Sequence, residues 1–355
     1  MMARALALAE RGLFTTTPNP RVGCVIAHGE RVVGEGWHEK AGLAHAEVNA
    51  LAQAGTHAAG ATVYVTLEPC RHHGRTPPCT DALVRAGVAR VVAAMRDPNP
   101  LAADGARQLE QAGIAFEAGL LEDEARELNI GWISRIARAR PWVRMKIAAS
   151  LDGRTALANG QSQWITGPEA RADGHRWRAR ACAILTGIGT VRADDPRLTV
   201  REVATPRQPL RIVIDSRLET PASARVLQGG ALVFCGAADA ARRSELEAAG
   251  AEVVSLPNAA GKVDLPAMLV ELGRREVNEL HVEAGVQLNG SLLREGCVDE
   301  FLLYLAPSFL GDGAQGMLAL PEIASLDARQ QLRLHRFDRV GDDLRILART
   351  LQQAG

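Results

Sequence analysis

The chain has 355 residues, and its 41 Lys and Arg side chains balance 41 Asp and Glu, so the formal net charge is zero. A neutral chain creates no overall field that would attract nucleic acid or an anionic membrane surface. No apolar run approaches the ~20 residues that span a bilayer, and the first residues lack the apolar segment of a secretion signal. A chain of this length predicts two domains.

Six cysteines in so long a chain do not form the dense disulfide framework of small secreted proteins. We therefore expect free thiols and a reducing, cytoplasmic location.

Strands and helices alternate in the first part of the chain, which predicts a layered α/β domain. Strands are predicted at residues 22–27, 31–36, 61–66, 88–94 and about 114–117. Helices are predicted at residues 2–11, 45–54, 80–86 and about 104–112. A helical connector follows over 121–139, and Arg140-Pro141 ends it. We therefore place the domain boundary between residues 139 and 140.

The alternation restarts beyond this boundary and predicts a second, largely parallel sheet. Strands are predicted at 142–149, 183–186, 210–215, 231–235, 252–255, 279–283 and 300–306, with a hairpin edge strand near 344–351. Helices are predicted at 167–179, 240–249, 265–272 and 288–295.

Two segments of the first domain combine one imidazole, two thiols and one carboxylate. His45 and Glu47 lie in one segment, and Cys70 and Cys79 bracket the other. Three N and S ligands are typical of catalytic zinc, which keeps a fourth position for a water whose pKa it lowers to about 7. His-x-Glu followed by Pro-Cys and another Cys is typical of zinc-dependent nucleobase deaminases. We therefore expect His45, Cys70 and Cys79 to bind Zn²⁺ and Glu47 to transfer protons.

Buried structural cysteines are the competing interpretation, since free cysteines often only fill a core. The Glu within the His motif and the Pro before Cys70 favour the metal. We expect a helix after Pro69 to present Cys70 at its N-terminus, where the helix dipole favours a thiolate. Eight residues separate the two cysteines, and this basic insert at 71–78 predicts an added loop.

The second domain gives weaker signals. Gly187-Ile188-Gly189 follows a strand but lacks the third glycine of a dinucleotide fingerprint, so a tight turn explains it nearly as well. Gly285 stands between a strand and a helix, where backbone N–H groups can hold a phosphate, although an ordinary turn explains it equally. Lys146 lies within an apolar strand, where an unpaired ammonium is costly. Arg178, Asp194, Arg197 and Arg201 form either an anion site or a solvated loop.

Longer motifs extend through both domains. In the first they are TPNPRVG at 17–23, HAE at 45–47, TLEPC at 66–70, HHGRTPPC at 72–79 and DPNP at 97–100. In the second they are KIAASLDGRT at 146–155, SQWIT at 162–166, ADDPRLTVR at 193–201 and IVIDS at 212–216. Together they resemble the bifunctional riboflavin-biosynthesis deaminase/reductase family. The resemblance implies a cytidine-deaminase-like three-layer domain over 1–139 and a dihydrofolate-reductase-like domain over 140–355.

The resemblance implies two successive reactions. The first domain would remove the 2-amino group of 2,5-diamino-6-(5-phosphoribosylamino)pyrimidin-4-one with Zn²⁺, and the second would reduce the ribosyl arm to ribityl with NADPH. It further implies small phosphorylated pyrimidines as substrates, no nucleic-acid or membrane partner, and a homodimer or homotetramer.

Two other functions stay open from the sequence. One is a zinc deaminase acting on another nucleotide or a nucleic-acid base, against which zero net charge and 4% aromatic residues count. The other is a zinc-stabilised scaffold without activity, whose second domain binds nucleotide as a sensor. Glu47 argues against it, because a structural site needs no proton shuttle.

The resemblance also places the site residues. In the deaminase it places the pyrimidine ring at Asn19 and the rest of the substrate among His38, His72, Arg75, Asp97 and Asn99, with Arg75 suited to the phosphate. In the reductase it places the substrate near Lys146, Ser162, Arg178, Leu198, Arg201 and Glu283. It places NADPH near Ala148, Trp164, Thr190, Asp194, Ser216, Gly285, Val286, Gln287, Leu288, Asn289, Gly290 and Ser291.

Roles within the reductase set follow from charge. Arg178 and Arg201 are expected to clamp the substrate phosphate. Lys146 and Glu283, expected at strand ends, are expected to promote opening of the ribose.

Two segments depart from the family pattern. Val286-Gln287 stand where the family usually has Pro-Thr, which bears on cofactor affinity. The segment at 101–105 is one residue shorter than usual, which bears on the substrate side of the deaminase.

Overall fold

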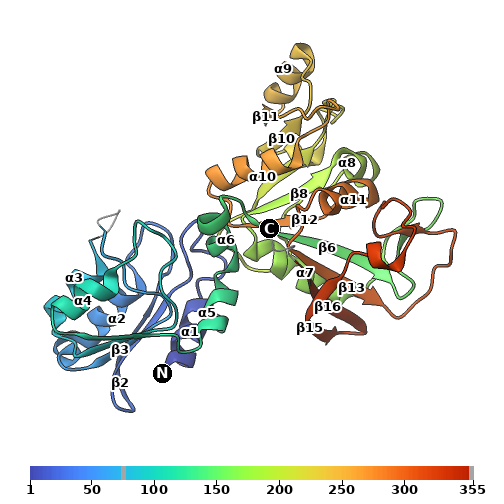
Figure 1. Cartoon of the computed structure of the whole chain (residues 1–355). Helices are drawn as coiled ribbons and strands as arrows, with labels where there is room; N and C mark the ends of the chain where they lie inside the picture. Colours follow the sequence, from blue (N-terminus) through green and yellow to red (C-terminus); the bar gives the residue numbers. More distant parts are fainter. Residues whose placement is uncertain (73–76, 352–355) are drawn as a thin grey trace. The chain divides into compact units, whose positions relative to one another are not determined.

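The computed structural model describes residues 1–72 and 77–351. The chain divides into two compact units, Met1–Ala139 and Arg140–Gly355, each built from helices around one main sheet (Figure 1). In the part of the chain that is described, no helix is both long and apolar enough to cross a membrane.

The first unit contains a five-stranded sheet in the order β2-β1-β3-β4-β5, in which only β1 is antiparallel to its neighbours. The strands are β1 Gly23–His28, β2 Arg31–Trp37, β3 Thr62–Val65, β4 Arg90–Ala93 and β5 Ala115–Ala118. The helices are α1 Met2–Glu10, α2 Ala46–Ala54, α3 Cys79–Ala86, α4 Gly105–Gln111, α5 Glu122–Leu128 and α6 Ile130–Arg138, with a 3-10 turn η1 at Gly55–Ala58.

Alternation along β2 shows that helices cover both faces of this sheet. Gly34 and Gly36 face α2 so closely that a Cβ on either would lie 2.3–2.5 Å from an α2 carbonyl oxygen. Glu35 and Trp37 point to the other face, where they meet Arg4 and Arg11 of α1 and of the turn after it. Successive strand side chains point to opposite faces, so the unit has three layers.

The helical connector predicted over 121–139 is interrupted. Asn129 separates α5 from α6 and has a φ of −109°, outside the helical range. Its side chain bonds to the backbone of Arg21 instead, a tertiary contact that the local sequence does not reveal.

The second unit contains a nine-stranded sheet in the order β11-β10-β9-β8-β12-β6-β13-β16-β15, in which only β16 is antiparallel to its neighbours. The main strands are β6 Trp142–Ser150, β8 Ala183–Gly187, β9 Leu210–Ile214, β10 Ala231–Cys235, β11 Ala251–Ser255, β12 Glu279–Val282, β13 Glu300–Ala306, β15 Leu332–Val340 and β16 Asp343–Thr350. A separate two-stranded ribbon joins β7 Arg154–Ala156 to β14 Gln315–Gly316. The helices are α7 Pro168–Arg180, α8 Ile188–Asp194, α9 Ala240–Ala248, α10 Leu265–Arg274 and α11 Val286–Arg294, with 3-10 turns η2 Arg225–Leu227 and η3 Leu326–Ala328.

The segment after β8, where the sequence left a dinucleotide-binding turn and an ordinary tight turn open, leads directly into the short helix α8. Two predictions for this unit need correction. The predicted last hairpin exists, but its edge strand is β15, which the prediction missed because its side chains are mostly exposed and show no buried face. Lys146 lies in the middle of β6 rather than at a strand end.

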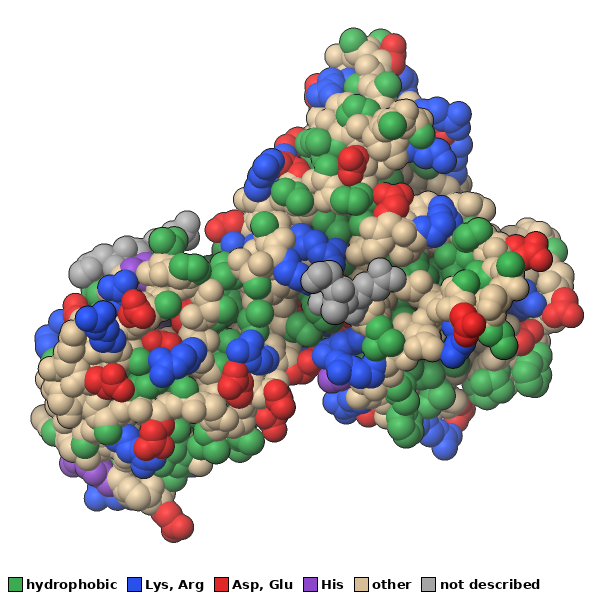
Figure 2. Space-filling model, viewed as in Figure 1, with side chains coloured by type: hydrophobic (Ala, Val, Ile, Leu, Met, Phe, Trp, Pro, Cys, Tyr) green, Lys and Arg blue, Asp and Glu red, His purple; other side chains and the backbone are tan. Residues whose placement is uncertain are grey.

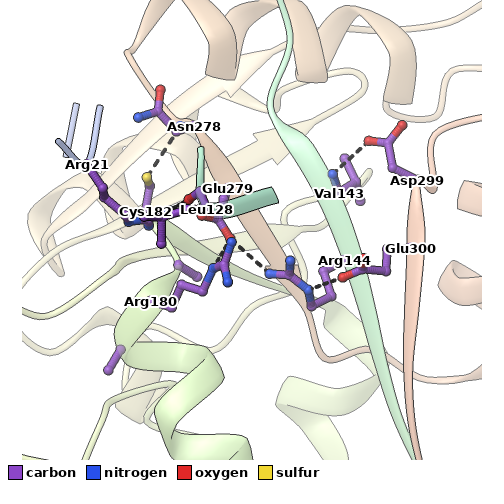
Figure 3. Close-up of polar contacts among 12 residues, drawn as sticks. Arg21, Leu128, Val143, Arg144, Arg180, Cys182, Asn278, Glu279, Asp299 and Glu300 are labelled. Atoms are coloured by element: carbon purple, nitrogen blue, oxygen red, sulfur yellow. Dashed lines mark hydrogen bonds and ion pairs between the residues drawn. The ribbon is translucent and has the colours of Figure 1, made fainter. Parts of the chain in front are cut away.

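The two faces of the large sheet differ in polarity. Met145, Val282 and Leu185 share an apolar core with α10 and α11. The opposite face carries a row of charges beneath α7, in which Arg144 donates to Glu279 at 3.0 Å and to Glu300 at 2.5 Å (Figure 3). Arg180 of α7 and Arg349 of β16 extend the row at its two ends.

We expect Arg144→Met to destabilise the second unit by about 3–5 kcal/mol, because it leaves two buried carboxylates without their shared cation. The three side chains are each 1% exposed. The measurement is hydrogen exchange of the β6 and β12 amides, which reports local opening free energy.

The matched control is Arg275→Met, which also removes a cation from two carboxylates, Glu252 and Glu271. These groups are 25–60% exposed, so the cost should be about 1 kcal/mol or less. Equal costs for the two variants would contradict the role of burial.

Candidate active sites

Three metal-binding side chains meet in the first unit. His45 Nδ1 lies 3.2 Å from Cys79 Sγ and 3.6 Å from Cys70 Sγ, and the three atoms lie within 4.8 Å of one another. Tetrahedral zinc with bonds of about 2.0–2.3 Å would separate its ligand atoms by roughly 3.3–3.8 Å. The donor set and its spacing therefore fit Zn²⁺, with His45 binding through Nδ1.

The ligands stand at the ends of secondary-structure elements. His45 is the N-cap of α2, Cys79 is the first residue of α3, and Cys70 lies in the loop after β3. The expectation that Cys70 begins a helix is wrong: Pro78 caps α3, so Cys79 has that position. Thr80 then fastens the Cys70 loop to α3, since its N–H and Oγ1 both donate to the Cys70 carbonyl.

Electrostatics distinguishes the two thiols. The Cys79 thiol donates to the Cys70 sulfur, and His45 adds a second donor, so the pKa of Cys70 falls to about 4 although burial opposes this. The same bond to Cys70, together with burial, raises the pKa of Cys79.

Glu47 lies in the first turn of α2 and is 4% exposed. Burial raises the pKa of its carboxyl, while the His45 charge partly opposes the rise. A carboxyl with a raised pKa accepts and returns protons more readily near neutral pH, which suits an acid–base role.

Two predicted substrate residues meet directly beside the metal ligands. Asn19 Nδ2 lies 3.0 Å from His38 Nε2, and His38 Nδ1 lies 3.1 Å from the carbonyl of Ala44. A ring nitrogen facing a carbonyl carries the proton, so Nε2 accepts from Asn19. The His38 ring also packs edge-on against His45 at 5.4 Å between centroids.

Asp97 and Asn99 form a compact turn beside the segment that carries Cys70. Asp97 Oδ1 accepts from the Asn99 N–H at 2.8 Å, and burial raises the pKa of Asp97 to about 7. The shortened segment folds back from this turn, because Ala102 and Ala103 both donate to the Asn99 carbonyl. A Cβ on Gly105 would lie 2.0 Å from the Pro69 carbonyl oxygen, so this loop closes tightly against the metal loop.

Sequence reasoning missed Glu68, which ties these two loops together. It is 4% exposed, and its two oxygens accept from the N–H groups of Asp97 and Ala106. Its position two residues before Cys70, in an otherwise apolar segment, was the available signal.

The insert between the cysteines is only partly described. His72 lies exposed at its start. Arg75, predicted to bind the phosphate, lies outside the described residues.

In the second unit the predicted cofactor residues gather where two chain connections diverge. The neighbouring strands β8 and β12 are parallel, but β8 leads toward β9 on one side and β12 leads toward β13 on the other. The crevice at such a point commonly binds nucleotides. Gly285 caps α11 there, and a Cβ on it would lie 3.8 Å from Thr190 Oγ1.

The turn at α11 fits a phosphate group. The first backbone N–H groups of a helix point toward such a ligand, whatever the side chains, so Val286 and Gln287 do not remove these donors. Asn289 Nδ2 fixes the turn by donating to the Ala284 carbonyl at 3.1 Å. Its Oδ1 is buried and has no hydrogen-bond partner among the described residues.

The remaining residues predicted to bind the cofactor differ in exposure and in their contacts. Ala148 lies on β6, Leu288 approaches Gly187, and Gly290 packs against the Ala319 carbonyl. Ser216 Oγ accepts from Val263, and Ser291 Oγ donates to Gln287. Asp194 ends α8 in solvent, and Trp164 is 70% exposed, with the Arg171 guanidinium over its ring.

Glu283 is the centre of the predicted substrate residues in this unit. Arg178 Nε and Nη2 donate to its two carboxylate oxygens at 2.5 and 2.6 Å. Burial alone would raise the pKa of Glu283, but Arg178 outweighs it and holds that pKa well below its usual range. Burial lowers the pKa of the neighbouring Lys146, and the Glu283 charge partly opposes this.

Arg178, predicted to hold the substrate phosphate, also binds a second protein group. Its Nη1 donates to the Thr199 carbonyl, so the guanidinium is already engaged on three sides. Arg201 is exposed and its Nη1 lies 3.3 Å from Thr199 Oγ1. Leu198 is buried with a φ of 49°, and Ser162 is half-buried.

Comparison with known proteins gives a consistent result. The family model described as the RibD C-terminal domain matches residues 141–346, and that described as the cytidine and deoxycytidylate deaminase zinc-binding region matches residues 1–95. Riboflavin biosynthesis protein RibD of Escherichia coli (strain K12) is 49% identical over 360 residues, covering 97% of this chain and 96% of the relative. The chain belongs to the RibD family.

Solved RibD structures share the whole fold. RibD of Acinetobacter baumannii, form 2, superposes with a TM-score of 0.90 at 41% identity, covering 99% of this chain and 98% of the other. The diaminohydroxyphosphoribosylaminopyrimidine deaminase/5-amino-6-(5-phosphoribosylamino)uracil reductase of Thermotoga maritima gives 0.88 at 30% identity, covering 99% and 97%. The predicted α/β fold and the riboflavin-biosynthesis deaminase and reductase activities are confirmed by these matches.

Two histidines of the RibD reductase unit escaped the sequence reasoning. His281 is fully buried on β12, with Nε2 3.1 Å from Glu283 Oε1. His175 is buried on α7, and its Nδ1 accepts from the Arg201 N–H at 3.3 Å. The alternation of Glu279, His281 and Glu283 was the available signal of a polar strand face.

We expect His175 to make this unit less stable in acid. Burial, with Arg178 and Arg201 adding to it, lowers the pKa of His175 to about 4. Between about pH 6.5 and pH 4 the unfolded chain then binds a proton that the folded chain does not, so stability falls as pH falls. His175→Asn keeps an acceptor near the Arg201 N–H but does not titrate.

Calorimetry at pH 7 and pH 5 measures this effect. The variant should lose less stability than the parent, by about 2 kcal/mol. His335→Asn, an exposed histidine of the same unit, is the control and should lose as much as the parent. An equal loss in His175→Asn and the parent would contradict the assignment.

Proposed function

We propose that residues 1–139 deaminate 2,5-diamino-6-(5-phosphoribosylamino)pyrimidin-4-one and that residues 140–355 then reduce its ribosyl arm to ribityl with NADPH. The observation that carries the first step is the cluster of His45, Cys70 and Cys79 beside buried Glu47. The similar Thermotoga maritima protein is named as a deaminase and a reductase of such compounds, which supports the choice of substrate.

In the deaminase, His45, Cys70 and Cys79 would hold zinc, which when bound supplies a water whose pKa is lowered to about 7. Glu47 takes the proton of the attacking water on its carboxylate and delivers it to the departing 2-amino nitrogen, which leaves as ammonia. Asn19 and His38 orient the pyrimidine ring, and Asp97 and Asn99 border it. His72 and Arg75 are proposed to reach the substrate from the insert.

In the reductase, NADPH supplies the hydride. Lys146, whose pKa burial lowers, can take and return a proton as the ribose opens, while Glu283 stays a carboxylate and orients it. Since Arg178 is engaged by Glu283, we assign the phosphate mainly to Arg201, with Ser162 and Leu198 lining the arm. NADPH is proposed to lie along Ala148, Trp164, Thr190, Asp194, Ser216 and the Gly285–Ser291 turn.

The molecular surface agrees with a small-molecule enzyme. Lys and Arg side chains are interspersed with Asp and Glu over the face seen in Figure 2, which does not resemble the continuous basic stripe of nucleic-acid binders. No disulfide joins any of the six cysteines, all of which lie within the described residues, and we propose a cytoplasmic location on that basis.

The direct test is a coupled assay on the zinc-loaded full chain. The diaminopyrimidine phosphoribosyl compound is supplied with NADPH, and ammonia release and NADPH oxidation are followed together. We expect both, with ammonia leading. Zinc-loaded protein that releases no ammonia would overturn the proposed substrate, and ammonia without NADPH oxidation would overturn the proposed second step.

In this assay we expect Glu47→Gln to slow ammonia release by on the order of 10²–10⁴, the usual contribution of acid–base catalysis. Zinc content and reduction of the pre-deaminated compound should be unchanged. Retained ammonia release would remove Glu47 from the mechanism, and loss of zinc would make it a structural residue of the site.

We expect Lys146→Met to slow NADPH oxidation by about 10²-fold or more while ammonia release continues. Lys262→Met makes the same change at an exposed position of the same unit and should have no effect. Unchanged reduction in Lys146→Met would refute its proton-transfer role.

A further inference from the structure

Asn129, which separates α5 from α6, binds the loop that carries Asn19. Asn129 is 1% exposed, and its Oδ1 accepts from the Arg21 N–H at 2.7 Å while its Nδ2 donates to the Arg21 carbonyl at 2.9 Å. One amide side chain thus satisfies both backbone groups of a residue 108 positions away. Such a paired contact is the bond pattern that a neighbouring strand would provide.

Two further bonds hold the same loop against the helices. Arg21 Nη1 donates to the Leu128 carbonyl at 2.7 Å, and Arg135 Nη2 donates to the Pro18 carbonyl at 3.2 Å. The loop is therefore fastened on both sides of Asn19, and the Asn19 N–H is itself bound to the Thr16 carbonyl at 2.8 Å.

From Asn19 the contacts continue to the metal ligands. The Asn19 amide donates to His38, and His38 donates to the carbonyl of Ala44, directly before His45. A displacement of the loop at Arg21 would move the amide of Asn19 relative to both His38 and the bound ring. An error of about 1 Å in such a position can cost 10²-fold in rate.

We infer that Asn129 is a positioning residue of the deaminase, which fixes the loop at residues 18–21 and so aims Asn19 at the pyrimidine ring. The inference rests on the proposed function of the first unit. The matched zinc-binding region ends at residue 95, and Asn129 lies beyond it, between the connector helices. A residue outside the matched region therefore supports the site within it.

A purely structural Asn129 would make a different prediction. Its loss would then lower stability and zinc retention together with activity, whether or not Asn19 were present. A positioning residue acts through Asn19, so the losses in kcat/KM caused by substituting Asn129 and by substituting Asn19 should not multiply.

The experiment compares the full zinc-loaded parent with Asn129→Ala, Asn19→Ala and the double variant. Ammonia release gives kcat and KM, and zinc content and reduction of the pre-deaminated compound are measured on the same samples. We expect Asn129→Ala to lower kcat/KM for deamination on the order of tenfold to a hundredfold, with zinc and reduction retained. In the Asn19→Ala background the same change should have little further effect.

Two more variants make the test robust. Asn129→Asp keeps the acceptor for the Arg21 N–H but turns a carboxylate toward the Arg21 carbonyl, so it should fall between the parent and Asn129→Ala and serves if Asn129→Ala does not fold. Arg126→Ala breaks only an exposed ion pair with Glu122 on α5 and should match the parent.

The possible outcomes distinguish the proposed function of the first unit from the positioning role of Asn129. A parent without ammonia release overturns the proposed function itself. An active parent with unimpaired Asn129→Ala and Asn129→Asp variants overturns the positioning role, as do losses that multiply with Asn19→Ala or that follow zinc content.

Discussion

The ion pair between Arg178 and Glu283 fixes a buried negative charge at the end of the sheet in the second unit. Glu283 follows a buried strand and Arg178 lies on the helix that covers the polar face, so their two short bonds join α7 to β12. A carboxylate with this partner stays ionised in a buried position. That fixed negative charge is the neighbour of Lys146, whose ammonium burial disfavours.

The row of Arg180, Glu279, Arg144, Glu300 and Arg349 extends the same face away from the site. Buried charges of this kind add little net stability when complete, but removing any one of them is costly. Their value to the enzyme is geometric, because each pair joins two elements and fixes where α7 lies over the sheet. The predicted substrate residues on α7, on β6 and directly after β12 thereby share one rigid support.

In the first unit the candidate catalytic residues lie on loops and at the starts of helices. The metal ligands stand at the starts of α2 and α3 and in the loop after β3, and each adjoining loop has a buried polar side chain that holds it. Glu68 binds the loop at Asp97 and the first turn of α4 at Ala106, and Asn129 binds the loop at Arg21. Functional loops held by a rigid scaffold are the general pattern, and here single side chains provide the attachment.

Sequence periodicity, glycine positions and the spacing of His45, Glu47, Cys70 and Cys79 determined the α/β class, most elements and the zinc-type donor set, since these depend on local pattern. The helix start at Cys79, the break at Asn129 and the exposed strand β15 were decided by tertiary contacts, which propensity does not contain. The same holds for the partner of Arg178. Sequence marks it as a cation suited to phosphate, but only the docking of α7 on β12 puts Glu283 within 2.6 Å, because residues 105 positions apart meet through the fold alone.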